Sequence, residues 1–163
     1  MSERRWVVNA SPVILLGEIG YLNLLTELSR TLVIPEAVGV EIHAGPQEDV
    51  AQRWLEAEGH AYLRQSAPVD TAIAGWDLGA GESAVLTWAR QHPEYEAVLD
   101  DRAARNCAVA LGIPVRGTLG VLLLAKREGL LDQVQPAFAA LVKAGLRIAP
   151  EILQAALRLA GEI

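Results

Sequence analysis

The chain has 163 residues, of which 52% are hydrophobic and 21% are charged, and its formal net charge is −6. This length and composition predict a single globular domain over residues 1–163, without a long disordered tail. The acidic balance argues against a broadly basic nucleic-acid binder, and the single cysteine, Cys107, excludes an intrachain disulfide and a zinc site built from cysteines.

The first half of the chain alternates short buried strands with helices. The stretch VVNASP, residues 7–12, indicates a strand that ends at Asn9, followed by a helix with Ser11 as its N-cap and Pro12 in its first turn. The hydrophobic pattern predicts strands at 5–9, 31–35 and 60–65, and helices at 12–18, 21–29, 37–45 and 47–58.

The second half has a clearer pattern of the same kind, in which the glycine-rich GAGES turn leads into a helix and Thr118 is the expected N-cap of another. Strands that alternate with helices predict a mainly parallel sheet covered on both faces, which is a three-layer α/β/α sandwich. The predicted strands are 95–101 and 113–117, and the predicted helices are 79–92, 102–112, 117–130, 135–144 and 150–160.

No apolar run reaches the length of about 18 residues that crosses a bilayer. The first residues, MSERRWVV, do not have the apolar segment and cleavage site of a secretory signal. We therefore expect a soluble, cytoplasmic protein.

Acidic side chains, and one amide, fall near the ends of predicted elements. Asn9 ends the first strand, Glu41 lies in a helix, Glu82 lies at a helix start, and Asp100 and Asp101 follow a strand. Because the chemistry of open α/β proteins lies at the carboxyl ends of parallel strands, these residues are candidates for one shared cleft. Carboxylate and amide oxygens are ligands that Mg²⁺ and Mn²⁺ prefer, and such ions activate water for phosphodiester cleavage.

Each of these residues also has a structural alternative. Asp101 is a suitable N-cap for the helix 102–112, and the charge of Glu82 is favoured by the dipole of its helix. Glu41 fits a solvated helix face, and Asn9 fits an ordinary turn. The three histidines lack metal-binding spacing and GAGES does not match the Walker A motif, so a histidine-bound metal or a nucleotide cofactor has little support.

Four segments of the chain, taken in order, resemble the PIN-domain-like proteins, most closely the branch related to VapC toxins. They are VVNASPVILLGEIGYLNLLTEL, VIPEAVGVEI, GAGESAVLTWA and AVLDDRAARNCAVALGIPVRGTLGVLLLAKREGLL. The resemblance covers about residues 6–160, and the stretch from LDDRAAR to GTLGVLLLAK is its most specific part.

The resemblance implies an α/β/α sandwich and a Mg²⁺- or Mn²⁺-dependent ribonuclease site. It also implies RNA as the substrate, a toxin role beside a small antitoxin protein, and a homodimer. By position, the family's first aspartate falls on Asn9 and the other acidic residues fall on Glu41, Glu82 and Asp101, with Asp100 beside them as an auxiliary ligand or orienting group. These five residues form the expected metal site, and the four carboxylates among them are the expected catalytic residues.

Asn9 departs from the family pattern, because an amide brings one neutral oxygen where an aspartate brings a charge and two oxygens. Two hypotheses follow from this difference. The chain is either a weakened but competent nuclease, or a catalytically inactive PIN-fold module that binds RNA or a protein partner. A small-molecule phosphatase is a weaker third hypothesis, since the first strand lacks the nucleophilic aspartate that it needs.

Overall fold

The computed structural model describes residues 3–46 and 49–163. Within these residues, five strands form one sheet in the order β3-β2-β1-β4-β5, and every neighbouring pair is parallel. The strands are β1 (Arg5–Val8), β2 (Thr31–Pro35), β3 (Leu63–Arg64), β4 (Glu96–Val98) and β5 (Val115–Arg116). The helices are α1 (Ala10–Glu18), α2 (Asn23–Glu27), α3 (Glu36–His43), α4 (Val50–Ala57), the 3₁₀ helix η1 (Gly59–Tyr62), α5 (Thr71–Ala74), α6 (Ala80–Gln91), α7 (Arg102–Ala110), α8 (Thr118–Arg127), α9 (Gln135–Ala144) and α10 (Pro150–Leu159).

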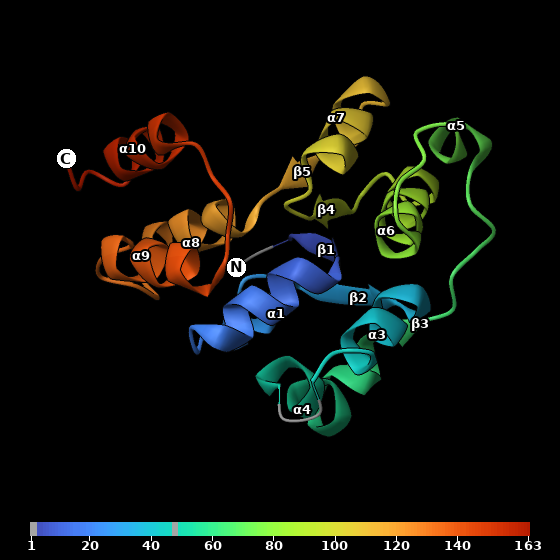
Figure 1. Cartoon of the computed structure of the whole chain (residues 1–163), viewed down its shortest axis with the longest axis horizontal. Helices are drawn as coiled ribbons and strands as arrows, with labels where there is room; N and C mark the ends of the chain where they lie inside the picture. Colours follow the sequence, from blue (N-terminus) through green and yellow to red (C-terminus); the bar gives the residue numbers. More distant parts are fainter. Residues whose placement is uncertain (1–2, 47–48) are drawn as a thin grey trace.

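The sheet lies between two layers of helices (Figure 1). Helix α6 packs against β1, β2 and β4, with α5 and α7 beside it. Helix α1 lies on the opposite face, where it contacts α3, α4, α8 and α9. The chain runs from β1 to β2 and β3 on one side and then crosses back over β1 to β4 and β5 on the other side, so the connecting helices cover both faces of the sheet. The predicted three-layer α/β/α sandwich is therefore confirmed.

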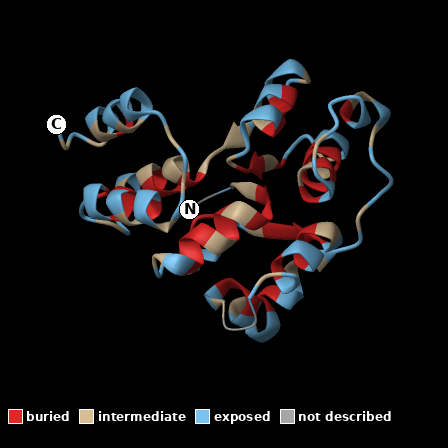
Figure 2. Cartoon of the chain, in the orientation of Figure 1, coloured by how far each residue is buried: buried red, intermediate tan, exposed pale blue. Residues whose placement is uncertain are grey.

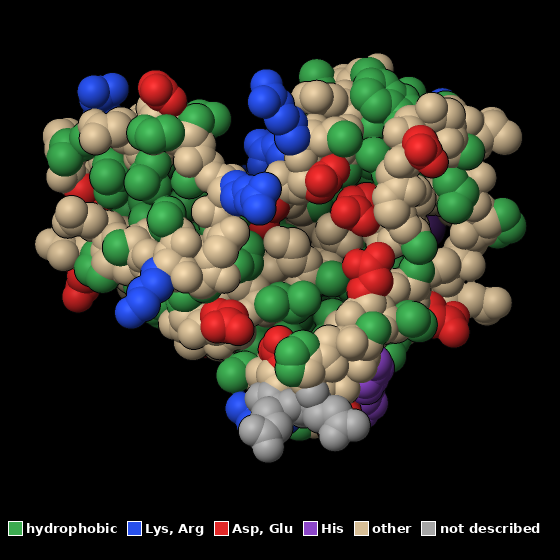
Figure 3. All heavy atoms as spheres, viewed as in Figure 1, with side chains coloured by type: hydrophobic (Ala, Val, Ile, Leu, Met, Phe, Trp, Pro, Cys, Tyr) green, Lys and Arg blue, Asp and Glu red, His purple; other side chains and the backbone are tan. Residues whose placement is uncertain are grey.

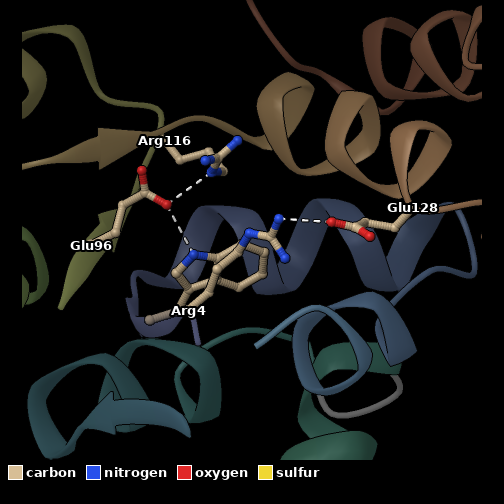
Figure 4. Close-up of polar contacts among 5 residues, drawn as sticks. Arg4, Glu96, Arg116 and Glu128 are labelled. Carbon is tan, nitrogen blue, oxygen red and sulfur yellow. Dashed lines mark hydrogen bonds and ion pairs between the residues drawn. The ribbon is translucent and has the colours of Figure 1, made fainter. Parts of the chain in front are cut away.

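The centre of the core is β1, whose residues Trp6, Val7 and Val8 are fully buried. A strand covered on both faces must be apolar on both, which explains the unbroken run of buried apolar residues in β1, and Figure 2 shows this strand as mostly buried. The indole of Trp6 donates a hydrogen bond to Glu96 Oε1 at 2.9 Å, and Arg116 Nε donates to the same oxygen at 2.8 Å (Figure 4). These bonds connect β1, β4 and β5 through one carboxylate.

The C-terminal helix α10 is mostly exposed, and Ala156 is its one buried residue (Figure 2). Polar contacts hold the chain that follows it. Glu162 accepts hydrogen bonds from Lys126 Nζ at 2.8 Å and from the backbone amides of Val134 and Gln135 at 2.7 and 2.9 Å. These contacts lower the pKa of Glu162, the bond from Lys126 being the largest cause. One carboxylate thus joins the end of the chain to α8 and to the start of α9.

The predicted caps of two helices are wrong. Helix α1 begins at Ala10, with Asn9 and not Ser11 at the N-cap position. The reason is that the backbone N–H of Asn9 still donates a hydrogen bond of 2.9 Å to Val98 O on the neighbouring strand. Gly117 occupies the N-cap position of α8. The hydroxyl of Thr118 is turned away to Asp100, so it does not cap the helix.

Between β2 and α6 the prediction and the structure also differ. The predicted strand 60–65 is shortened to β3, since Gly59–Tyr62 form a 3₁₀ helix, and α5 was not expected. Helix α5 is a single turn that Asp70 caps through a hydrogen bond from Ala72 N at 2.8 Å. Residues 47–48 of the predicted helix 47–58 lie outside the described residues, and α4 starts at Val50. Among the described residues, no helix combines the length and apolar character needed to cross a membrane.

Candidate functional site

The polar residues singled out in the sequence lie around the carboxyl ends of β1 and β4. These strands are hydrogen-bonded neighbours, and Asn9 follows one of them while Asp100 and Asp101 follow the other. Helices α3 and α6, which carry Glu41 and Glu82, pack against each other. Figure 3 shows acidic side chains, in red, following one another across this side of the molecule, with basic side chains, in blue, beside them.

Asn9 and Glu41 come together over the backbone of Gly81. Glu41 Oε1 accepts a hydrogen bond of 2.9 Å from Gly81 N. A Cβ atom at position 81 would lie 2.5 Å from Glu41 Oε1 and 3.0 Å from Asn9 Oδ1. A Cβ at this position would collide with the oxygen of Glu41 and crowd that of Asn9, so glycine allows the amide and the carboxylate to meet at the start of α6.

The side-chain oxygen of Asn9 has no hydrogen-bond partner among the described residues. The Asn9 residue is only 3% exposed, and Oδ1 is one of three buried side-chain polar atoms in the described structure that are left unpaired. Leaving a buried acceptor unpaired costs about 1–3 kcal/mol. A hydrogen-bond donor or a cation that contacted this oxygen would remove that cost.

Glu82 lies close enough to two other carboxylates to feel their charges. Burial, as the largest cause, together with the charges of Glu41 and Asp101, raises the pKa of Glu82 above its ordinary value of 4.5. A hydrogen bond from its own backbone amide acts in the opposite direction. Its Oε2 atom lies 2.7 Å from the position of a Cβ on Gly79, so the side chain is folded back over the start of α6.

The two aspartates after β4 have different environments. Asp101 Oδ2 accepts a hydrogen bond of 3.0 Å from Ala104 N, so Asp101 caps α7 while its residue remains exposed. Asp100 turns both oxygens to Thr118, accepting from its amide at 2.8 Å and from its hydroxyl at 2.6 Å. Thr118 is fully buried, so these two bonds fix the carboxylate of Asp100 against the start of α8.

The donor atoms fit a divalent cation in kind. They are carboxylate oxygens and one unpaired amide oxygen, which are the ligands that Mg²⁺ and Mn²⁺ prefer. No three Asp, Glu, His or Cys side chains within residues 3–46 and 49–163 are gathered closely enough to form a metal site by themselves. Asn9, Glu41, Glu82 and Asp101 would hold such an ion together with water.

Sequence reasoning missed two glycines and an arginine. Gly81 makes room for the meeting of Asn9 and Glu41, and a Cβ on Gly117 would lie 2.5 Å from Arg105 Nη1 and 3.2 Å from Asp100 Oδ1. A signal for both glycines is present, because each directly precedes a residue already of interest, Glu82 or Thr118. Nothing in the sequence pattern distinguished Arg105 from Arg102, the other basic residue of its helix.

Comparison with known proteins agrees with the architecture. No curated protein matches this chain in sequence. A family model described as DUF3368, PIN domain, matches residues 5–162, which is nearly the whole chain. PIN domains are typically metal-dependent nucleases, so the match supports a nuclease-type fold. The chain belongs to the PIN-domain family DUF3368.

Proposed function

We propose that this protein is a Mg²⁺- or Mn²⁺-dependent endoribonuclease of the VapC toxin type. The observation that carries the proposal is the unpaired, buried oxygen of Asn9 beside the carboxylate of Glu41, at the carboxyl end of the central strand. A buried acceptor without a donor, next to a negative charge, is an arrangement that a cation stabilises.

The roles of the residues follow from their surroundings. Asn9, Glu41, Glu82 and Asp101 bind the cation, directly or through water. When bound, the ion activates a water molecule and neutralises charge on the cleaved phosphate. When the ion is absent, burial and then the charges of Glu41 and Asp101 raise the pKa of Glu82, and a cation bound beside it would lower that pKa again.

Asp100 serves as an auxiliary group in this proposal. Both of its oxygens are held by Thr118, which fixes the start of α8 against the end of β4. Its negative charge adds to those of Glu41, Glu82 and Asp101, and these four carboxylates form the acidic cluster. A protein antitoxin, a second copy of the chain as a homodimer partner and a cytoplasmic location belong to the same proposal, and they rest on the toxin-type resemblance.

The test is cleavage of mixed single-stranded RNA across a titration of Mn²⁺ and Mg²⁺. Asp101→Asn is the informative variant, because asparagine caps a helix as well as aspartate does but has no charge. Asp132→Ala, at an exposed position outside the acidic cluster, is the matched control. We expect metal-dependent cleavage that is lost in Asp101→Asn and retained in Asp132→Ala. Cleavage that survives Asp101→Asn would contradict the assignment.

The second candidate function is an inactive PIN-fold module that binds RNA or a protein partner. The neutral amide of Asn9 favours it, because a missing charge weakens a cation site. Adding Asn9→Asp to the same assay separates the two. If the natural sequence does not cleave RNA and Asn9→Asp does, the fold is an inactive scaffold that lacks only the carboxylate at position 9.

A further inference from the structure

Two arginine side chains lie on glycine backbone around the start of α8. The guanidinium group of Arg105 occupies the space in which a Cβ of Gly117 would lie, next to Asp100. Similarly, Arg116 Cγ lies 2.9 Å from the position of a Cβ on Gly120. Glycine at 117 and 120 therefore allows both arginines to lie close to the chain at the edge of the acidic cluster.

A groove of about 480 Å³ begins at Arg116 and follows α8 to α10. Its walls combine the basic side chains of Arg116, Lys126 and Arg127 with leucines of α8 and α10. Helix α8 has ten residues and is therefore about 15 Å long. Figure 3 shows this side of the molecule hollowed between the parts that α10 and α7 occupy in Figure 1, with basic side chains beside the hollow.

The basic residues of this region differ in their partners. Lys126 forms an ion pair with Glu162, and Arg116 forms one with Glu96. Neither Arg105 nor Arg127 forms an ion pair or donates a side-chain hydrogen bond within residues 3–46 and 49–163. In a protein with a net charge of −6, the described structure therefore leaves two guanidinium groups without an ion-pair partner, that of Arg105 beside Gly117 and that of Arg127 on the wall of the groove.

We propose that an RNA strand leaves the acidic cluster over Gly117 and continues along the groove between α8 and α10, with its phosphates bound by Arg105 and Arg127. The guanidinium fork matches the geometry of phosphate oxygens. Arg116 lines the groove and directly precedes Gly117, and the amide of the next residue, Thr118, donates a hydrogen bond to Asp100 in the acidic cluster. This inference rests on the proposed function and adds the route of the substrate.

The experiment measures the affinity of fluorescently labelled single-stranded RNA over a range of NaCl concentrations, in EDTA so that nothing is cleaved. Arg105→Ala and Arg127→Ala are each expected to weaken binding about three- to tenfold and to reduce the slope of log K against log [salt] by about 0.7, the value for one lost phosphate contact on a single strand. Arg53→Ala, at an exposed arginine of α4, is the matched control and should leave both quantities unchanged.

Two further measurements separate a phosphate contact from a structural role. Gly117→Ala keeps every charge but places a methyl group where the guanidinium of Arg105 lies, and it should weaken binding as Arg105→Ala does. An RNA of two nucleotides should bind Arg127→Ala as well as it binds the natural protein, because it cannot reach from the cluster to the far end of α8.

The failure of this inference differs from the failure of the proposed function. If the protein binds RNA but does not cleave it at any metal concentration, the proposed nuclease activity is wrong and the proposed strand path is retained. If the natural protein cleaves RNA but Arg127→Ala has the same RNA affinity and salt slope as Arg53→Ala, the proposed strand path is wrong and the proposed nuclease activity is retained. The absence of RNA binding by the natural protein would overturn the path as well.

Discussion

Replacing Asn9 by aspartate places a second carboxylate beside Glu41. The two side-chain oxygens lie 3.0 Å and 2.5 Å from the same point, so their separation is at most the sum of these distances, about 5.5 Å. Two negative charges at that separation repel by about 3 kcal/mol at an effective dielectric constant of about 20, and by about 1 kcal/mol in bulk water. Because Asn9 is buried and Glu41 is exposed, we expect a value between these limits.

Without a cation, Asn9→Asp should therefore lower the melting temperature by about 2–12 °C, since 1 kcal/mol corresponds to about 2–4 °C in a chain of this size. With Mn²⁺ or Mg²⁺ the sign reverses, because the added charge attracts the ion. We expect the affinity for Mn²⁺ to rise at least about tenfold, which corresponds to about 1.4 kcal/mol.

Thermal unfolding at pH 7, first in EDTA and then across a Mn²⁺ titration, measures both effects, and calorimetry gives the affinity. Asn23→Asp, at an exposed position on α2, adds the same charge outside the cluster and is the control. If Asn9→Asp and Asn23→Asp melt together in EDTA and bind Mn²⁺ equally, then the oxygens at positions 9 and 41 do not share a cation site.

Three other changes test the same region and the C-terminal contacts. Gly81→Ala should reduce cleavage at least about tenfold while the protein stays folded, because its Cβ displaces two site oxygens but alanine favours helix; Gly75→Ala, which meets nothing within 4 Å, should be silent in the same RNA assay. In EDTA, Glu82→Gln should raise the melting temperature at pH 7, since a raised pKa means that ionisation costs stability; the gain should vanish as the pH falls below 4.5, and a gain that persists there would contradict this cause. Glu162→Gln should lower the melting temperature at pH 7 and have no effect in acid, because the lowered pKa of Glu162 stabilises the fold only while the carboxyl is ionised; an equal loss at both pH values would point to packing.

The architecture was predictable because its signals are periodic. The run of buried residues in β1, the segment TLVIP and the strand before Asp100 are short apolar stretches separated by helical patterns, and this alternation determines a parallel sheet. Helix starts were less predictable. Ser11 and Thr118 are good caps by residue type, but tertiary hydrogen bonds from Asn9 to β4 and from Thr118 to Asp100 determine where the helices begin.

The candidate site was predictable in its residue types and not in its contacts. Position after a strand indicated Asn9 and Asp101, whereas the side-chain directions depend on neighbours that are distant in sequence. The contact of Asn9 with Glu41 depends on Gly81, which is 40 residues from Glu41 along the chain. A glycine gives no chemical signal of its own, so its role becomes visible only when the space that a Cβ would fill is known.

The amide at position 9 affects metal affinity and metal-free stability in opposite directions. Burial first, and then the charges of Glu41 and Asp101, raise the pKa of Glu82, so its ionised form is disfavoured when no cation is present. A carboxylate at position 9 would add a further negative charge beside Glu41, whereas the amide oxygen presents only a partial charge. In the proposed metal site, Asn9 would therefore stabilise the metal-free protein and weaken the binding of a cation through the same electrostatic difference. A weakened nuclease and an inactive scaffold then differ only in their affinity for the cation, and the concentration of Mn²⁺ or Mg²⁺ at which the site fills distinguishes them.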